Sequence, residues 1–131
     1  MKKILLIDAS DTYIWCLQKY LQRRGYPVET ASTLKEARTA IQEEMPLVIC
    51  CDLDLPDGTA MELFHALRRV AGMFQMKNPP VRLLPFFILT ENNDLATEYE
   101  YRHEGVNDYI TAPVNIPELI RRIMYFVEDS K

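Results

Sequence analysis

Two aspartates follow apolar runs in this chain, at places where an acidic site can form. Asp52 follows the run 47–51 and opens the segment 52–58, DLDLPDG, while Asp8 follows the run 4–7. In open α/β sheets, ligands and reacting groups gather just beyond the C-terminal ends of buried strands. The pattern therefore predicts an acidic site made by the Asp8 and Asp52 carboxylates. The alternative is that both side chains only cap nearby backbone N–H groups.

Five short apolar runs predict the strands that would position these aspartates. The candidate strands are 3–8, 27–31, 47–52, 84–90 and 107–110. Three of them are almost wholly apolar, as parallel strands covered on both faces are. Their alternation with helices predicts right-handed crossovers and a single doubly wound α/β domain over 1–131. We expect a parallel, flavodoxin-like sheet of five strands in the order 2-1-3-4-5, which makes strands 1 and 3 neighbours.

Apolar residues at helical spacing predict a helix after each strand. The periodic segments are 14–21, 34–41, 60–71 and 116–127, and a fifth helix is expected over 94–103, which is polar and rich in tyrosine and glutamate. We expect Asp11 to cap the first helix and Ser32 or Thr33 to cap the second, because short polar side chains accept hydrogen bonds from free N–H groups at helix starts.

Five features, met in the right order, resemble the motifs of response-regulator receiver domains. Asp8 matches the acidic residue that ends strand 1. Asp52 matches the phosphoaccepting aspartate, and 52–58 matches its loop. The segment 85–90, PFFILT, resembles strand 4, and 105–110, GVNDYI, resembles the approach to strand 5. The resemblance covers nearly the whole chain and implies a receiver domain.

The resemblance also implies a metal-dependent phosphorylation site. Mg²⁺ takes oxygen ligands, which the family would supply here as the carboxylates of Asp8 and Asp52 and the backbone carbonyl of Asp54. Thr90 stands where the family has a hydroxyl that bonds a phosphoryl oxygen, and Tyr109 stands at the aromatic switch position. The alternatives are a plain strand-end hydroxyl for Thr90 and a packed edge aromatic for Tyr109.

Three positions depart from the family pattern. Ala9 replaces a second acidic residue beside Asp8, Ala112 replaces the lysine that pairs with the phosphoryl group, and Glu91 replaces a small residue after strand 4. Alanine cannot make a charge-assisted bond to phosphate. Clustered carboxylates raise one another's pKa and repel a dianion. We therefore expect weak Mg²⁺ binding, unless Glu91 supplies the missing oxygen.

These departures favour an atypical receiver that works in two-component signalling through protein contacts, with weak or no phosphorylation. The alternative is a working receiver that catalyses at most its own phosphorylation on Asp52, with Mg²⁺, from a histidine-kinase phosphodonor. Neither is a metabolic enzyme. A cofactor module is disfavoured, because the segment 9–12 has no glycine to form a phosphate loop.

A sensor histidine kinase or another signalling protein is the expected partner, and a homodimer is a further expectation. The family's output face is its fourth helix, fifth strand and fifth helix. Tyrosine and arginine are enriched at interfaces. On that face this chain offers Tyr99, Tyr101, Arg102, Tyr109, Arg121, Arg122 and Tyr125.

Composition narrows the functional classes. The net charge of −4 argues against a nucleic-acid surface. The N-terminal apolar run of four residues is too short for a signal peptide or a membrane span. Cys16, Cys50 and Cys51 show no metal-binding spacing, so reduced thiols in a cytoplasmic protein are expected.

Two features leave alternatives open. The segment 72–84 is longer than receivers usually have between the third helix and strand 4. Its Met73, Phe74 and Met76 either pack beneath the loop or form a partner-binding patch. The Ala112-Pro113 bond is cis if it follows the family, although most X–Pro bonds are trans.

Overall fold

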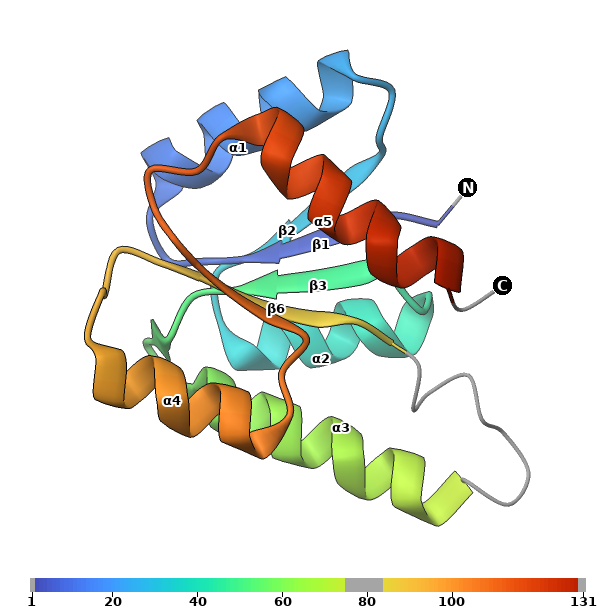
Figure 1. The fold of residues 1–131 in the computed structure, drawn as a ribbon. Coiled ribbons are helices and arrows are strands. Elements are labelled where there is room, and N and C mark those ends of the chain that lie inside the picture. The colour runs from blue at the N-terminus through green and yellow to red at the C-terminus, as the bar shows by residue number, and fades with distance from the viewer. Residues whose placement is uncertain (1, 75–83, 130–131) are drawn as a thin grey trace.

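The computed structural model describes residues 2–74 and 84–129. Its main sheet has five parallel strands in the order β2-β1-β3-β6-β7 (Figure 1). They are β1 (Ile4–Ile7), β2 (Val28–Ala31), β3 (Val48–Cys51), β6 (Phe86–Thr90) and β7 (Asp108–Thr111). This is the predicted order, 2-1-3-4-5, with strand bounds that differ by one or two residues. A small antiparallel pair, β4 (Asp54–Leu55) with β5 (Gly58–Thr59), was not predicted.

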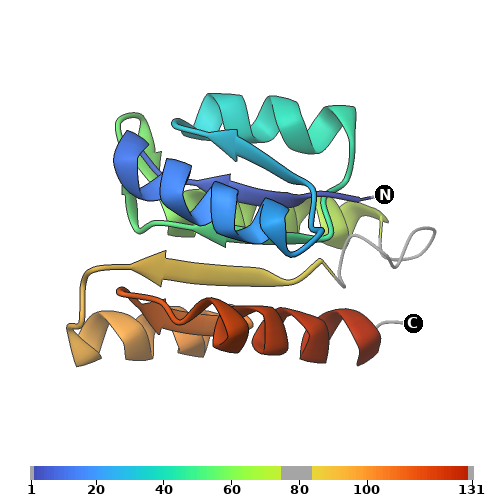
Figure 2. The ribbon, with the colours of Figure 1, turned by 90° about the horizontal axis from the view of Figure 1, so that it is seen from above.

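The five helices are α1 (Asp11–Arg23), α2 (Leu34–Glu43), α3 (Ala60–Phe74), α4 (Leu95–Glu104) and α5 (Ile116–Asp129). Figures 1 and 2 show helices on both sides of the sheet. On one face, Leu21 of α1 and Leu119 of α5 pack against strand residues such as Phe87. On the other face, α2, α3 and α4 cover the alternate strand residues, including Phe86. The sheet is therefore buried on both faces, which explains its continuous apolar strands.

The helix starts correct one prediction and decide another. α1 begins at Asp11, so the N-cap position is Ser10, and the expectation that Asp11 caps this helix was wrong. Thr33 is the N-cap of α2 and accepts a hydrogen bond from the Glu36 N–H at 3.0 Å. Ser32 instead donates its N–H and hydroxyl to the Glu36 carboxylate. Both turns join sheet to helix at the edge where the aspartates lie.

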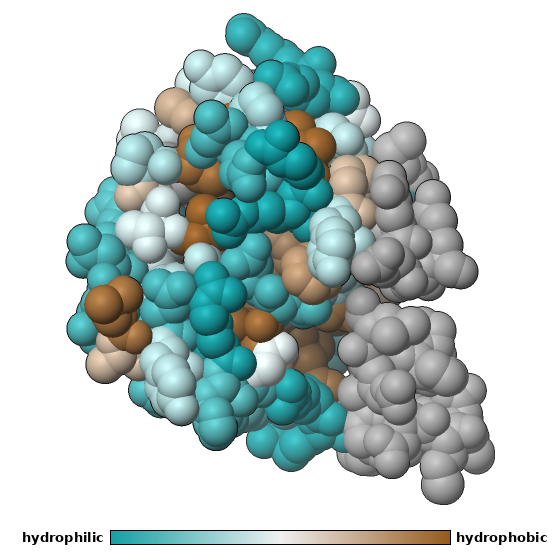
Figure 3. All heavy atoms as spheres, in the orientation of Figure 1, coloured by the Kyte–Doolittle hydropathy of each residue, from teal (hydrophilic) through white to brown (hydrophobic). Residues whose placement is uncertain are grey.

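The structure bears on three further expectations, which concern the segment 72–84, the Ala112-Pro113 bond and membrane-spanning helices. α3 runs on to Phe74, while 75–83, including Met76, lie outside the described residues. The Ala112-Pro113 peptide is cis. Within residues 2–74 and 84–129, no helix is long and apolar enough to cross a membrane. Figure 3 shows a largely hydrophilic face with small, separate apolar areas.

Candidate functional site

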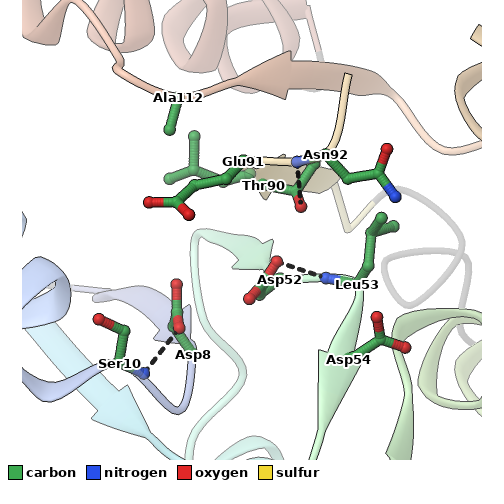
Figure 4. Close-up of a pocket in the computed structure, with 10 residues that line it drawn as sticks. Asp8, Ser10, Asp52, Leu53, Asp54, Thr90, Glu91, Asn92 and Ala112 are labelled. Atoms are coloured by element: carbon green, nitrogen blue, oxygen red, sulfur yellow. Dashed lines mark hydrogen bonds between the residues drawn. The ribbon is translucent and has the colours of Figure 1, made fainter. Parts of the chain in front are cut away.

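The ends of β1, β3 and β6 enclose a pocket of about 230 Å³ at one edge of the sheet (Figure 4). The Asp52 N–H donates to the Ile7 carbonyl at 2.8 Å, so Asp52 lies directly beside the end of β1. Asp8 and Asp52 both line the pocket, as the strand order predicted. The pocket is lined by Asp8, Ser10, Asp52, Leu53, Asp54, Leu89, Thr90, Glu91, Asn92 and Ala112.

Each of the two central carboxylates is held by a backbone N–H. The Ser10 N–H donates to Asp8 Oδ1, and the Leu53 N–H donates to Asp52 Oδ1, both at 2.8 Å. The side chains therefore do accept from nearby N–H groups, as the alternative reading supposed. They also face a common pocket, so the two readings are compatible.

The pocket disfavours negative charge on Asp8. Burial raises the pKa of Asp8, and the nearby charges of Asp52 and Glu91 raise it further, against the opposing effect of the Ser10 N–H. In Figure 4 the Glu91 carboxylate lies on the side of the pocket formed by Asp8 and Ser10. The crowding of carboxylates expected from the sequence is therefore present.

Two of the altered positions face this pocket. Ala112 points a methyl group toward it, opposite Asp52, and brings no charge (Figure 4). Glu91 adds a carboxylate from the end of β6. Among the residues that the structure describes, no three His, Cys, Asp or Glu side chains are grouped as a metal centre.

A short hydrogen-bonded path leads away from the pocket toward α4. Thr90 Oγ1 accepts from the Asn92 N–H, and the Tyr109 hydroxyl donates to the Asn92 carbonyl, both at 3.1 Å. Thr90 and Tyr109 are 6% and 3% exposed, so the two ends of the path are buried, while Asn92 between them is exposed. Asn92 Oδ1 accepts from the N–H of Asp94, the N-cap of α4. The sequence analysis did not single out Asn92; its place two residues after Thr90 was the available signal.

A second feature that the sequence did not reveal is the Asp108 network, formed by Asp108, Arg102 and Arg122. Asp108 Oδ1 accepts from Arg102 Nη2 at 3.1 Å, and Oδ2 accepts from Arg122 Nη1 at 3.0 Å. Arg102 Nη2 also donates to the Tyr109 carbonyl at 3.2 Å. The network joins α4 and α5 across β7, next to Tyr109.

The expected contact face is only partly exposed. Tyr99 and Tyr125 are 70% and 64% exposed, and Arg121 is also exposed. Tyr101 was wrongly expected there: it is 7% exposed, and its hydroxyl accepts from the Met61 N–H at 3.3 Å. Tyr109 is buried as well. Leu95, 78% exposed on α4, adds an apolar side chain that the sequence analysis did not name.

Comparisons with known proteins agree with this geometry. The family model of the response regulator receiver domain matches residues 4–124. The alkaline phosphatase synthesis transcriptional regulatory protein PhoP of Bacillus subtilis is 30% identical over 99% of this chain and 50% of its own length. The receiver domain of the Francisella response regulator 1452 superposes with a TM-score of 0.81 at 25% identity, covering 100% of both chains.

A two-component response regulator from Clostridium difficile gives a TM-score of 0.82 over 100% of this chain and 99% of that one, at 21% identity, which speaks for the fold alone. The chain spans 48% to 61% of the length of curated relatives that it matches. The family match covers almost the whole fold, including every strand of the main sheet and the pocket at its edge. The chain therefore belongs to the response regulator receiver domain family.

Proposed function

We propose that this receiver acts in two-component signalling mainly through protein contacts, with weak or no phosphorylation of Asp52. The observation that carries the proposal is the charge of the pocket. Asp8, Asp52 and Glu91 line it, and the described lining residues, with Ala112 in place of a lysine, include no positively charged side chain. An incoming phosphoryl group is a dianion, and like charges at close range repel it.

Receiver domains typically bind Mg²⁺ for phosphorylation, and the pocket retains part of a fitting donor set. Mg²⁺ is commonly held by one or two carboxylates and keeps several waters. Asp8 and Asp52 would hold it, together with the Asp54 carbonyl. Ala9 supplies no further oxygen from its side chain, so we expect weak binding. When bound, the metal would neutralise charge on a phosphoryl group.

The second candidate is a working phosphotransfer receiver modified on Asp52. One specific observation favours it: the Asn92 peptide group bonds Thr90 through its N–H and Tyr109 through its carbonyl. A change at the Thr90 hydroxyl could therefore reach the aromatic switch position without a further intermediary. Such activity would be limited to autophosphotransfer from a histidine-kinase donor, and we propose no metabolic reaction.

Receiver domains interact with histidine kinases, and we propose a sensor kinase or another signalling protein as the partner. The exposed side chains of Tyr99, Arg121 and Tyr125 support a contact on α4 and α5, including contact with a second copy of the chain. We also propose a cytoplasmic location, since Cys16, Cys50 and Cys51 are free thiols.

Amide NMR, first with Mg²⁺ and then with beryllofluoride, a phosphoryl mimic, tests the proposal. The wild-type chain should give little response at millimolar Mg²⁺ and none that spreads to Tyr109. The double variant Glu91→Ala/Ala112→Lys should gain a response to beryllofluoride, because it removes an anion and adds a cation. The matched control is Glu91→Ala/Ala112→Met, which adds similar bulk without charge.

Two results would overturn this reading. A strong wild-type response centred on Asp8, Asp52 and Thr90 and reaching Tyr109 would establish the working receiver instead. Equal responses of the lysine and methionine variants would show that pocket charge does not limit anion binding.

A further inference from the structure

The turn between β4 and β5 is bonded to the first residues of α2, which lie more than twenty positions earlier in the sequence. Asp57 Oδ1 accepts from the Leu34 N–H at 2.7 Å, and Asp57 Oδ2 accepts from the Lys35 N–H at 3.1 Å. We call this pair of bonds the Asp57 clasp. The first N–H groups of a helix have no partner within the helix. The helix's own cap, Thr33, takes a different one, that of Glu36.

The clasp is favourable in charge and tight in shape. A carboxylate is stabilised at the positive end of a helix. The Leu34 N–H, followed by that of Lys35, lowers the pKa of Asp57, so the charged form is the one that binds. The next residue, Gly58, has φ +152°, and a Cβ there would lie 2.5 Å from Glu62 Oε2 of α3 and 2.6 Å from Leu34 Cδ1 of α2. The turn therefore lies close to both helices, and a larger residue at position 58 would displace their side chains.

The clasped segment is also the wall of the acidic pocket. Asp54, whose carbonyl is a candidate metal ligand, lies on β4 and pairs with Thr59 of β5. Leu53, between Asp52 and Asp54, is 5% exposed, and its carbonyl accepts from the Ala60 N–H at 2.9 Å. The segment 52–59 is therefore fixed at two places: buried Leu53 anchors its start, and the Asp57 clasp anchors its turn.

The start of α2, where Asp57 binds, is also connected to Asp8 through β2. α2 follows β2, whose last residue, Ala31, accepts from the Asp8 N–H at 3.0 Å. Contacts therefore run from Asp8 through Ala31 to the start of α2, across the clasp to Asp57, and along the β4–β5 pair to Asp54. Together with the bond from the Asp52 N–H to the Ile7 carbonyl, these contacts form a closed loop that passes through Asp8 and Asp52.

We propose that Asp57 is a positioning residue for the acidic pocket, holding the Asp52–Asp54 segment at a fixed place relative to Asp8 through its two bonds to α2. The part of this inference that concerns metal affinity rests on the proposed function. The part that concerns pocket geometry does not. The simpler alternative is that Asp57 only completes the capping of α2.

Two variants separate these roles. Asp57→Asn keeps the size of the side chain but has one acceptor oxygen and no charge. Thr33→Ala also removes a cap from α2 and leaves the Asp57 clasp intact, so it is the matched control. Amide NMR spectra without metal should show Asp57→Asn shifting Leu53 and Asp54 as well as Leu34 and Lys35. Thr33→Ala should shift only the first turn of α2.

A third variant reaches the same turn by another route. Gly58→Ala places a Cβ against Glu62 and Leu34, at a φ of +152° that L residues rarely adopt, and should reproduce the Asp54 shift with the Asp57 carboxylate intact. A Mg²⁺ titration completes the test: Asp57→Asn should weaken binding at least threefold, and Thr33→Ala should leave it within measurement error.

Shifts confined to α2 in both Asp57→Asn and Thr33→Ala would overturn the inference, as would equal changes in Mg²⁺ affinity. Should the wild-type chain bind no Mg²⁺, the metal-free spectra still decide the question. Strong Mg²⁺ and beryllofluoride responses in the wild type would refute the proposed function and leave the positioning role standing. The proposed function and the positioning role of Asp57 can therefore be refuted independently of each other.

Discussion

Replacing Asp108 by alanine should remove the link between α4, β7 and α5. The Asp108 side chain is 13% exposed and bonds Arg102 at 3.1 Å and Arg122 at 3.0 Å. Because Arg102 also bonds the Tyr109 carbonyl, the network helps to fix the strand that carries Tyr109. Asp108→Ala leaves both guanidinium groups without this partner.

The expected loss follows from burial on the two sides of each pair. A hydrogen bond to a charged group contributes roughly 1.5–3 kcal/mol when buried, whereas an exposed ion pair contributes about 0–1 kcal/mol. Here Asp108 is nearly buried, but Arg102 and Arg122 are 45% and 39% exposed, so water screens their charge. We take about 1 kcal/mol for each pair, or about 2 kcal/mol in total. For a chain of this length, that corresponds to a fall in Tm of about 8 °C.

Urea unfolding and calorimetry of Asp108→Ala measure this loss directly. The control is Arg121→Ala: Arg121 lies beside Arg122 on α5, is 73% exposed and pairs only with Glu118 among the described residues, so its loss should change little. A double-mutant cycle of Asp108→Ala with Arg122→Ala should give a coupling of about 1 kcal/mol that shrinks in high salt. A loss below about 0.5 kcal/mol for Asp108→Ala, or one equal to that of Arg121→Ala, would refute this reasoning.

Three further outcomes are expected. Glu91→Gln should lower the pKa of Asp8, because it removes one of the charges that raise it; a ¹³C carboxyl titration measures this, and an unchanged value would contradict the proximity of the two side chains. Asp8→Asn should stabilise the fold at pH 7. The pKa of Asp8 is raised in the folded state, so the fold loses stability as the pH rises from the unfolded-state pKa of about 3.9 through the higher folded-state pKa. Urea unfolding at pH 7 and pH 3 should therefore show a gain only at the higher pH, and equal gains at both would count against it. Leu119→Ala, at a side chain that is 0% exposed, should cost about 2–5 kcal/mol in the same assay, and a cost under 1 kcal/mol would mean that the α5 packing is looser than described.

Most of the fold could be predicted from the local pattern of apolar residues along the sequence. Strands such as 48–51 and 86–90 are buried on both faces, so they are almost wholly apolar and can be predicted from their own residues. α4 shows little apolar periodicity in its sequence, because it buries Tyr101 yet exposes Leu95 and Tyr99, which blurs its apolar face. The same blurring explains why Tyr101 was wrongly assigned to the contact surface.

The short β4–β5 pair escaped prediction for a different reason. Each strand has only two residues, which is too short to show an alternating pattern. Its turn is held by Asp57 bonds to Leu34 and Lys35, and no local sequence signal marks a contact across 22 or 23 positions.

The sequence by itself determined that Asp8 and Asp52 would end neighbouring strands, because hydrophobic periodicity and crossover handedness leave few arrangements of five βα units. It also showed which positions depart from the family pattern, since those are matters of residue type alone. Only the tertiary structure decided how these groups act on one another. The raised pKa of Asp8, the Asn92 path from Thr90 to Tyr109, and the Asp108 network depend on burial and on distances of about 3 Å between residues from different elements. Such distances follow from packing, in which every side chain takes part, and so no single segment of the sequence contains them.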